Sequence, residues 1–258
     1  MKHSLKITLA YDGTAYAGWQ LQPDRLTVQG VLETALQKIT GETIRVTASG
    51  RTDAGVHALG QVVGLTTHSQ LPPEVLQKGL NAVLPDDIVV REVCEAPAGF
   101  HAIRDAQRKR YRYVINDAPI RDVFARRYCW QFSQRLDEGA MQRAARGLVG
   151  QHDFCSYESR GAPRQTTIRT VYLLEVCRRE DGKLQIEIEA DGFLYNMVRA
   201  IVGTLVEVGR GAEADTYPSQ VLAAKNRSAG GATAPPEGLF LVKVDYGNSC
   251  ESPTSSPA

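Results

Sequence analysis

Residues 5–11 read LKITLAY, and a large apolar side chain occupies every second position of this stretch. A period of two is typical of a β-strand with one buried face, so the stretch predicts a strand that ends at the Asp-Gly turn of residues 12–13. Residues 28–39 then carry apolar side chains at helical spacing, with Thr27 as a candidate N-cap and Gly41 just beyond the end. These two segments predict a strand followed by an amphipathic helix.

The rest of the first half extends this pattern. We expect strands at 44–48, 61–67 and 88–93, and a helix at 72–84 that starts with proline. The resulting order, βαββαβ, is that of a ferredoxin-like (split βαβ) fold.

The second half repeats the same order. The expected elements are strands at 111–115, 168–177, 184–190 and 239–246, helices at 136–148 and 193–208, and a short helix near 219–225. We therefore expect an α+β fold in which two ferredoxin-like halves share an extended antiparallel sheet. The predicted halves are residues 1–105 and 106–247, and the Ser- and Pro-rich residues 248–258 are expected to form a disordered tail.

The composition is that of an ordinary globular protein. The 258 residues are 43% hydrophobic and 23% charged, which sets aside disordered, fibrous and disulfide-rich classes. The formal net charge is only +1, so total charge does not indicate nucleic acid as a partner. The five cysteines form no C-x-x-C pair and the histidines lack metal-ligand spacing, so we expect neither a disulfide framework nor a metal. No signal peptide or membrane span is evident, which predicts a cytoplasmic location.

Residues 49–58 are the first candidate site. They read SGRTDAGVHA and lie between two expected strands, with small residues around Arg51, Asp53 and His57. A nearby arginine favours the ionised form of Asp53, and an ionised carboxylate can act as a nucleophile or stabilise positive charge. An aspartate in a glycine-rich connection is also a common turn former, and a single histidine is commonly structural. The stretch by itself leaves both interpretations open.

A second segment combines positive charge with aromatic rings. Residues 104–113 read RDAQRKRYRY, and residues 100–146 hold 11 Lys and Arg against 5 Asp and Glu, a local excess of +6. Cations can contact the phosphate backbone while a tyrosine stacks on an unpaired base, a combination that RNA recognition uses. Arg110, Tyr111 and Arg112 are therefore candidate substrate-binding residues. A solvated basic surface gives the same pattern, and the RNP1 motif of an RNA-recognition motif is absent.

The expected helix at 193–208 carries a third candidate. Tyr195, Arg199 and Gly203 recur every four residues beside its apolar stripe, so Arg199 is directed towards one face. Periodicity alone also fits a solvated arginine. Arg199 would gain a function only through a partnership with Asp53, which the sequence does not show.

Several short motifs, taken together, resemble one enzyme family. In chain order they are YDGT at 11–14, GWQ at 18–20, TVQG at 27–30, GRTDAGVHA at 50–58, FHA at 100–102, YRY at 111–113, GQHDF at 150–154, FLYNMVR at 193–199 and APPEGL at 234–239. With this order, the chain from about residue 5 to residue 247 closely resembles the tRNA pseudouridine synthase A family.

The resemblance implies an enzyme that isomerises uridine to pseudouridine at positions 38, 39 and 40 of the tRNA anticodon arm, without metal or organic cofactor. The resemblance implies that Asp53 is the nucleophile and that Arg199 is the active-site arginine that pairs with Asp53. It also implies that Arg51 flips or holds the target nucleotide and that Tyr111 stacks on the target base. It leaves open whether Asp53 adds to the sugar or acts as a base. It also implies a homodimer that binds one tRNA across both subunits, with the site in a cleft between the two halves.

Two other functions remain compatible with the residues. A non-catalytic tandem RNA-binding protein would explain the basic aromatic segment but would leave Asp53 without a role. A nucleoside or glycoside hydrolase also breaks a glycosidic bond, but that chemistry usually needs paired carboxylates, and the 49–58 loop offers one.

Overall fold

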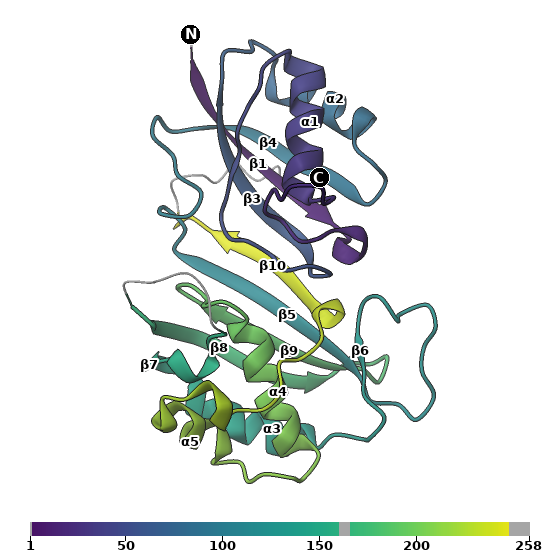
Figure 1. The fold of residues 1–258 in the computed structure, drawn as a ribbon, viewed down its shortest axis with the longest axis vertical. Helices are drawn as coiled ribbons and strands as arrows, with labels where there is room; N and C mark the ends of the chain where they lie inside the picture. Colours follow the sequence, from purple (N-terminus) through teal and green to yellow (C-terminus); the bar gives the residue numbers. More distant parts are fainter. Residues whose placement is uncertain (1, 160–165, 248–258) are drawn as a thin grey trace, which may run out of the picture. The chain divides into compact units, whose positions relative to one another are not determined.

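The computed structural model describes residues 2–159 and 166–247. Its strands form a mostly antiparallel sheet flanked by helices, so the predicted α+β class is confirmed (Figure 1). Contacts divide the described chain into two compact units, one with the residues up to Gln107 and those from Leu241 onward, the other with Arg108–Phe240. The predicted tail at 248–258 lies outside the described residues.

The first unit has the predicted βαββαβ order. Its elements are β1 (His3–Tyr11), α1 (Val28–Thr40), β2 (Thr47–Ala48), β3 (His57–Thr67), α2 (Pro73–Val83) and β4 (Ile88–Ala96). The strands lie in the order β4-β1-β3, and β2 pairs with β3. The predicted caps of α1 are present, because the Thr27 side chain accepts a hydrogen bond from the Gly30 N–H and Gly41 ends the helix at φ 74°.

Strand β10 (Leu239–Asp245) lies beside β3, and its residues from Leu241 onward belong to the first unit. The sequence pattern places residues 239–246 with the second half instead, so the two divisions differ there. The reason is a close backbone approach, since a Cβ atom on Gly60 would lie only 2.6 Å from the Val242 carbonyl oxygen. Glycine at position 60 lets β10 pack against β3.

Strand β2 is shorter than the predicted strand at 44–48. Ile44 and Val46 are buried, as the alternating pattern predicts. The Val46 N–H, however, donates to the Glu33 side chain at 3.1 Å. A side chain of α1 thus takes the place of a strand partner, and only Thr47–Ala48 pair with β3.

The second unit contains β5 (Arg108–Asn116), β6 (Trp130–Gln131), α3 (Glu138–Ala145), β7 (Gly150–Asp153), β8 (Ile168–Arg178), β9 (Leu184–Ala190), α4 (Met197–Gly209) and α5 (Tyr217–Ala224). Its strands lie in the order β5-β9-β8-β7, and β6 pairs in parallel with β5. Figure 1 shows α3, α4 and α5 clustered within this unit. Short 3₁₀ helices occur at Gly13–Ala15, Arg146–Leu148, Cys155–Tyr157, Arg227–Ala229 and Pro236–Gly238.

Helix α4 starts four residues later than the sequence predicts. Asn196 adopts the left-handed conformation, with φ at 61°, directly before Met197. A left-handed residue interrupts helical hydrogen bonding, so residues 193–196 lie outside the helix, with a turn at 195–196. Across the described residues, no helix is long and apolar enough to cross a membrane.

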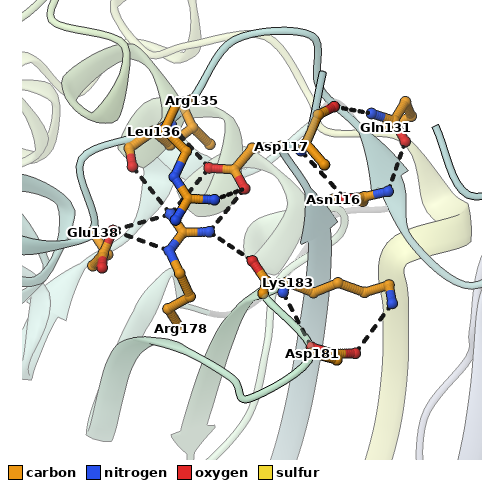
Figure 2. A network of polar contacts seen from close by, with 11 residues as sticks. Asn116, Asp117, Gln131, Arg135, Leu136, Glu138, Arg178, Asp181 and Lys183 are labelled. Atoms are coloured by element: carbon orange, nitrogen blue, oxygen red, sulfur yellow. Dashed lines mark hydrogen bonds and ion pairs between the residues drawn. The ribbon is translucent and has the colours of Figure 1, made fainter. Parts of the chain in front are cut away.

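A buried ion pair closes the long connection between β5 and α3 (Figure 2). The Asp117 carboxylate has no exposed surface and accepts hydrogen bonds from Arg178 at 2.8 and 3.0 Å and from the Leu136 N–H at 2.9 Å. Arg178 also reaches Glu138 at 3.0 Å. Burial raises the pKa of Asp117, but the Arg178 guanidinium and the Leu136 N–H outweigh burial and hold that pKa below its usual value. Asp117 is therefore ionised and fully hydrogen-bonded at neutral pH.

Candidate active site

The backbone just before Asp53 is held by two aromatic residues. The Tyr11 hydroxyl hydrogen-bonds to Thr52 Oγ1 at 2.7 Å, and the Trp19 N–H donates to the Thr52 carbonyl at 2.9 Å. Burial raises the pKa of Tyr11 to about 12, so at neutral pH its hydroxyl is protonated. Thr52 is itself buried, whereas Asp53 is partly exposed. The chain therefore fixes the backbone before Asp53 while Asp53 itself stays partly exposed.

Two glycines allow this loop to approach its neighbours. A Cβ atom on Gly18 would lie 2.7 Å from the Thr52 carbonyl oxygen, and one on Gly13 would lie 2.0 Å from the Val56 carbonyl oxygen. Real Cβ atoms essentially never come within 3.0 Å of another atom. The YDGT and GWQ motifs are thus explained as the surfaces on which the Asp53 loop packs.

A buried glutamine fixes the start of the same loop. Ser49 Oγ donates to Gln61 Oε1 at 2.7 Å, and Gln61 Nε2 donates to the Gly50 carbonyl at 2.8 Å. Ser49 and Gln61 are completely buried. The sequence interpretation did not identify Gln61, although a glutamine within an otherwise apolar strand is the signal that could have revealed it.

His57 is buried at the end of the loop. Its Nδ1 accepts a hydrogen bond from the Gly13 N–H at 3.1 Å and lies 3.1 Å from Asp12 Oδ1. These contacts join the turn at residues 12–14 to the loop. His57 thus links this turn to the Asp53 loop.

Arg51 is exposed in the same loop. It lies two residues before Asp53, on the outer side of the segment that Thr52 anchors. A guanidinium at such a position can contact a phosphate or an extruded base without being part of the core.

Strand β5 separates the predicted RNA-binding residues. Tyr111 is buried, and its ring centre lies 5.0 Å from that of Phe193, in a nearly perpendicular arrangement. Arg110 and Arg112 point to the opposite face, because side chains alternate along a strand. Arg110 bonds to Glu189 at 2.7 Å and Arg112 to Glu187 at 2.9 Å. The structure therefore does not bring these two arginines together with Tyr111.

Arg199 is oriented by the segment that precedes β10. Its Nε donates to the Ala234 carbonyl at 2.7 Å, and one terminal nitrogen donates to Asn196 Oδ1 at 3.1 Å. The Ala234 N–H in turn donates to the Arg199 carbonyl at 3.1 Å. Arg199 is partly buried and fixed in direction, unlike a solvated surface arginine. The left-handed Asn196 contributes to this orientation, and the helical pattern around it does not predict its conformation.

Of the predicted catalytic residues, Asp53 and Arg51 belong to the first unit, and Arg199 belongs to the second together with Tyr111. Within the described ranges 2–159 and 166–247, no group of three or more His, Cys, Asp or Glu could hold a metal ion.

A family model described as tRNA pseudouridine synthase matches residues 7–104 and 144–247. The chain belongs to the tRNA pseudouridine synthase family. Family members isomerise uridine to pseudouridine in tRNA, so the chain is an isomerase that acts on tRNA. The resemblance inferred from the motifs is confirmed, and a purely RNA-binding role is not favoured.

Close relatives match this tRNA pseudouridine synthase along nearly its whole length. A tRNA pseudouridine synthase A from Geobacillus sp. (strain WCH70) is 48% identical over 249 residues, which cover 96% of this chain and 100% of the relative. The protein of the same name from Brevibacillus brevis (strain 47 / JCM 6285 / NBRC 100599) is 49% identical over 242 residues, which cover 94% and 99%. The family assignment therefore applies to both units.

Solved structures offer a more distant likeness to this family member. The crystal structure of the archaeal box H/ACA sRNP Nop10-Cbf5 complex matches with a TM-score of 0.36 and 10% identity, over 78% of this chain and 44% of that chain.

Proposed function

We propose that this enzyme modifies uridines at positions 38, 39 and 40 of the tRNA anticodon arm, with Asp53 as the nucleophile. The observation that carries the proposal is the Asp53 loop, whose backbone is fixed by Tyr11, Trp19 and Gln61 while Asp53 itself stays partly exposed. The family match supports it, because residues 7–104 include this loop. A carboxylate held at a fixed position meets the main requirement of the reaction.

The proposed reaction exchanges one bond to the sugar for another. The Asp53 carboxylate attacks C1′ while the C1′–N1 bond breaks, and the electron pair of the C1′–N1 bond leaves with the uracil. The uracil turns so that C5 faces C1′, and C5 then attacks C1′ and displaces the carboxylate. The C5 proton is lost and N1 gains a proton, so no atom is added or removed overall. In an alternative route, Asp53 acts as a base and a glycal-like intermediate forms.

Three further residues complete the proposed site. Arg199 supplies a positive charge of fixed direction, since Ala234 and Asn196 hold its guanidinium. Arg51 flips or holds the target nucleotide, and Tyr111 stacks on the extruded base. Extrusion is needed because a detached uracil held between stacked neighbours cannot turn to present C5 to C1′.

Arg110 and Arg112 are proposed to contact the tRNA backbone away from the target base. They would act from the face opposite Tyr111 and would have to share their charge between a phosphate and Glu189 or Glu187. We also propose that the enzyme works as a cytoplasmic homodimer that binds one tRNA across both subunits. Light scattering of the protein with and without tRNA measures this assembly directly.

The deciding experiment measures tritium release from anticodon-arm tRNA that contains 5-tritiated uridine. Release by the wild type and none by Asp53→Asn is the expected result, with tRNA affinity retained in the variant. Asp86→Asn, which changes an exposed aspartate of the same unit, serves as the matched control and should keep full activity. Appearance of free uracil would instead indicate a hydrolase, and tRNA binding without tritium release would indicate an RNA-binding protein.

A further inference from the structure

Lys109 lies on the same face of β5 as Tyr111. Side chains alternate along the strand, so Lys109 and Tyr111 share the face opposite Arg110 and Arg112. In the pairing of β5 with β9, Lys109 stands opposite Ala190 and Tyr111 stands opposite Ile188. The cation that accompanies the tyrosine on its own face is therefore this lysine, not either neighbouring arginine.

A second cation approaches this face from β8. Ala190 is also paired with Val171, and Arg169 precedes Val171 by two residues. A Cβ atom on Gly192 would lie 3.4 Å from Arg169 Nε, so the Arg169 side chain passes over this glycine. The small residues Ala190 and Gly192 leave room for the two long cationic side chains.

The two cations affect each other electrostatically. Burial, and to a lesser extent the positive charge of Arg169, lower the pKa of Lys109 to about 8. On the opposite face of the sheet, Glu189 of β9 pairs with Arg108 and Arg110. An anion placed beside both cations would be attracted by each of them and would favour the charged lysine.

We propose that Lys109 and Arg169 form a binding site for an RNA phosphate adjacent to the target uridine. The proposal rests on the proposed function, in which the target base stacks on Tyr111. Residues two apart on one face of a strand are separated by about 7 Å, which is on the scale of a single nucleotide. The site would hold the RNA backbone while the target base stacks on Tyr111.

The test removes one negative charge from the RNA and one positive charge from the protein. Anticodon-arm RNAs carry a single neutral methylphosphonate, either 5′ or 3′ of the target uridine, and tritium release gives kcat/KM for the wild type and for Lys109→Gln. When the methylphosphonate replaces the contacted phosphate, the kcat/KM of the wild type should fall by about tenfold or more. Lys109→Gln should lose a similar factor on ordinary RNA, and the methylphosphonate should then cause no further loss.

Salt dependence supplies a second measurement. Each phosphate contact with a single strand contributes about 0.7 to the slope of log affinity against log salt concentration. Lys109→Gln should lower the slope by about that amount, and Lys109→Arg, which keeps the charge, should retain it. Arg179→Gln removes an exposed arginine just beyond the far end of β8, about 30 Å along the strand from Arg169, and should behave as the wild type.

The outcomes separate this site from the function on which it depends. Equal methylphosphonate losses in the wild type and Lys109→Gln at both positions would refute the phosphate contact, while Asp53-dependent tritium release would still support the proposed reaction. If circular dichroism shows that Lys109→Gln does not fold, Arg169→Gln takes its place in the same comparison. An unchanged methylphosphonate effect in that variant would equally overturn the proposal.

Discussion

Substituting Gly203 by alanine should inactivate the enzyme without removing any catalytic group. Gly203 lies one helical turn after Arg199 in α4, where the segment 231–234 crosses the helix. There the Gly231 N–H donates to Thr204 Oγ1, and the Ala234 N–H donates to the Arg199 carbonyl. The same segment accepts the hydrogen bond that orients the Arg199 guanidinium.

The size of the effect follows from one distance. A Cβ atom on Gly203 would lie 1.7 Å from the Ala232 carbonyl oxygen, whereas real contacts stay beyond 3.0 Å, so the backbones must separate by at least 1.3 Å. A misplacement of about 1 Å can cost about 100-fold in rate. Helix propensity acts the other way, because alanine is about 1 kcal/mol better than glycine within a helix. Sterics should dominate, since both backbones at this contact are held by hydrogen bonds.

The matched control is Gly79→Ala in α2. The nearest atoms to a Cβ there belong to the Ile39 side chain at 3.4 Å, an ordinary contact, so the same propensity gain comes without a clash. We expect Gly79→Ala to keep wild-type tritium release and to raise Tm by a few degrees. Gly203→Ala should lower kcat by about 100-fold or more and lower Tm. Wild-type kcat in Gly203→Ala would refute the idea that the 231–234 segment orients Arg199.

Three further predictions follow from buried polar groups. Asp117→Asn should lower the free energy of unfolding by about 3 kcal/mol at pH 7, because it leaves a guanidinium without its buried carboxylate. Since the folded pKa of Asp117 is depressed, this stabilisation is present above about pH 4 and lost as the pH falls further. The stability of Asp117→Asn should therefore fall less steeply in acid than that of the wild type, whereas the exposed control Asp86→Asn should keep the wild-type profile. Thr52→Val should reduce kcat and lower stability by about 1–3 kcal/mol by removing the partner of Tyr11, and Thr52→Ser should restore both. The free energy of unfolding of the wild type should increase as the pH rises from about 8 towards 10, because Lys109 keeps its proton in the unfolded chain but releases it in the folded protein. Lys109→Gln should not show this increase.

The sequence patterns predicted the long elements well, because burial on one face leaves a clear period. Strand β1 and helix α1 were expected within two residues of their observed ends. Strands β6 and β7 were missed, since two to four residues are too few to show a period. The start of α4 was misplaced because the conformation of Asn196 depends on tertiary contacts, including its hydrogen bond to Ser159.

In the candidate site, too, the residues marked by a local sequence pattern could be predicted, whereas those that act through distant contacts could not. Arg51 and Asp53 could be singled out because they share a short glycine-rich loop. Gln61 and Ala234 could not, since their roles depend on hydrogen bonds to residues 11 to 35 positions away. The local pattern therefore singled out the proposed catalytic carboxylate but not the groups that hold the loop and Arg199 in place.

A charge count along the chain does not distinguish the two faces of β5. The local excess of +6 at residues 100–146 includes Arg110 and Arg112, whose carboxylate partners come from β9, outside that window. Lys109 contributes one charge to the same sum, yet strand alternation places it with Tyr111 on the opposite face. A cation can therefore accompany a base stacked on Tyr111 only if it lies on the same face of β5. The summed charge along the chain does not contain this information. The methylphosphonate comparison measures this distinction, because a summed charge would make every cation of β5 equivalent.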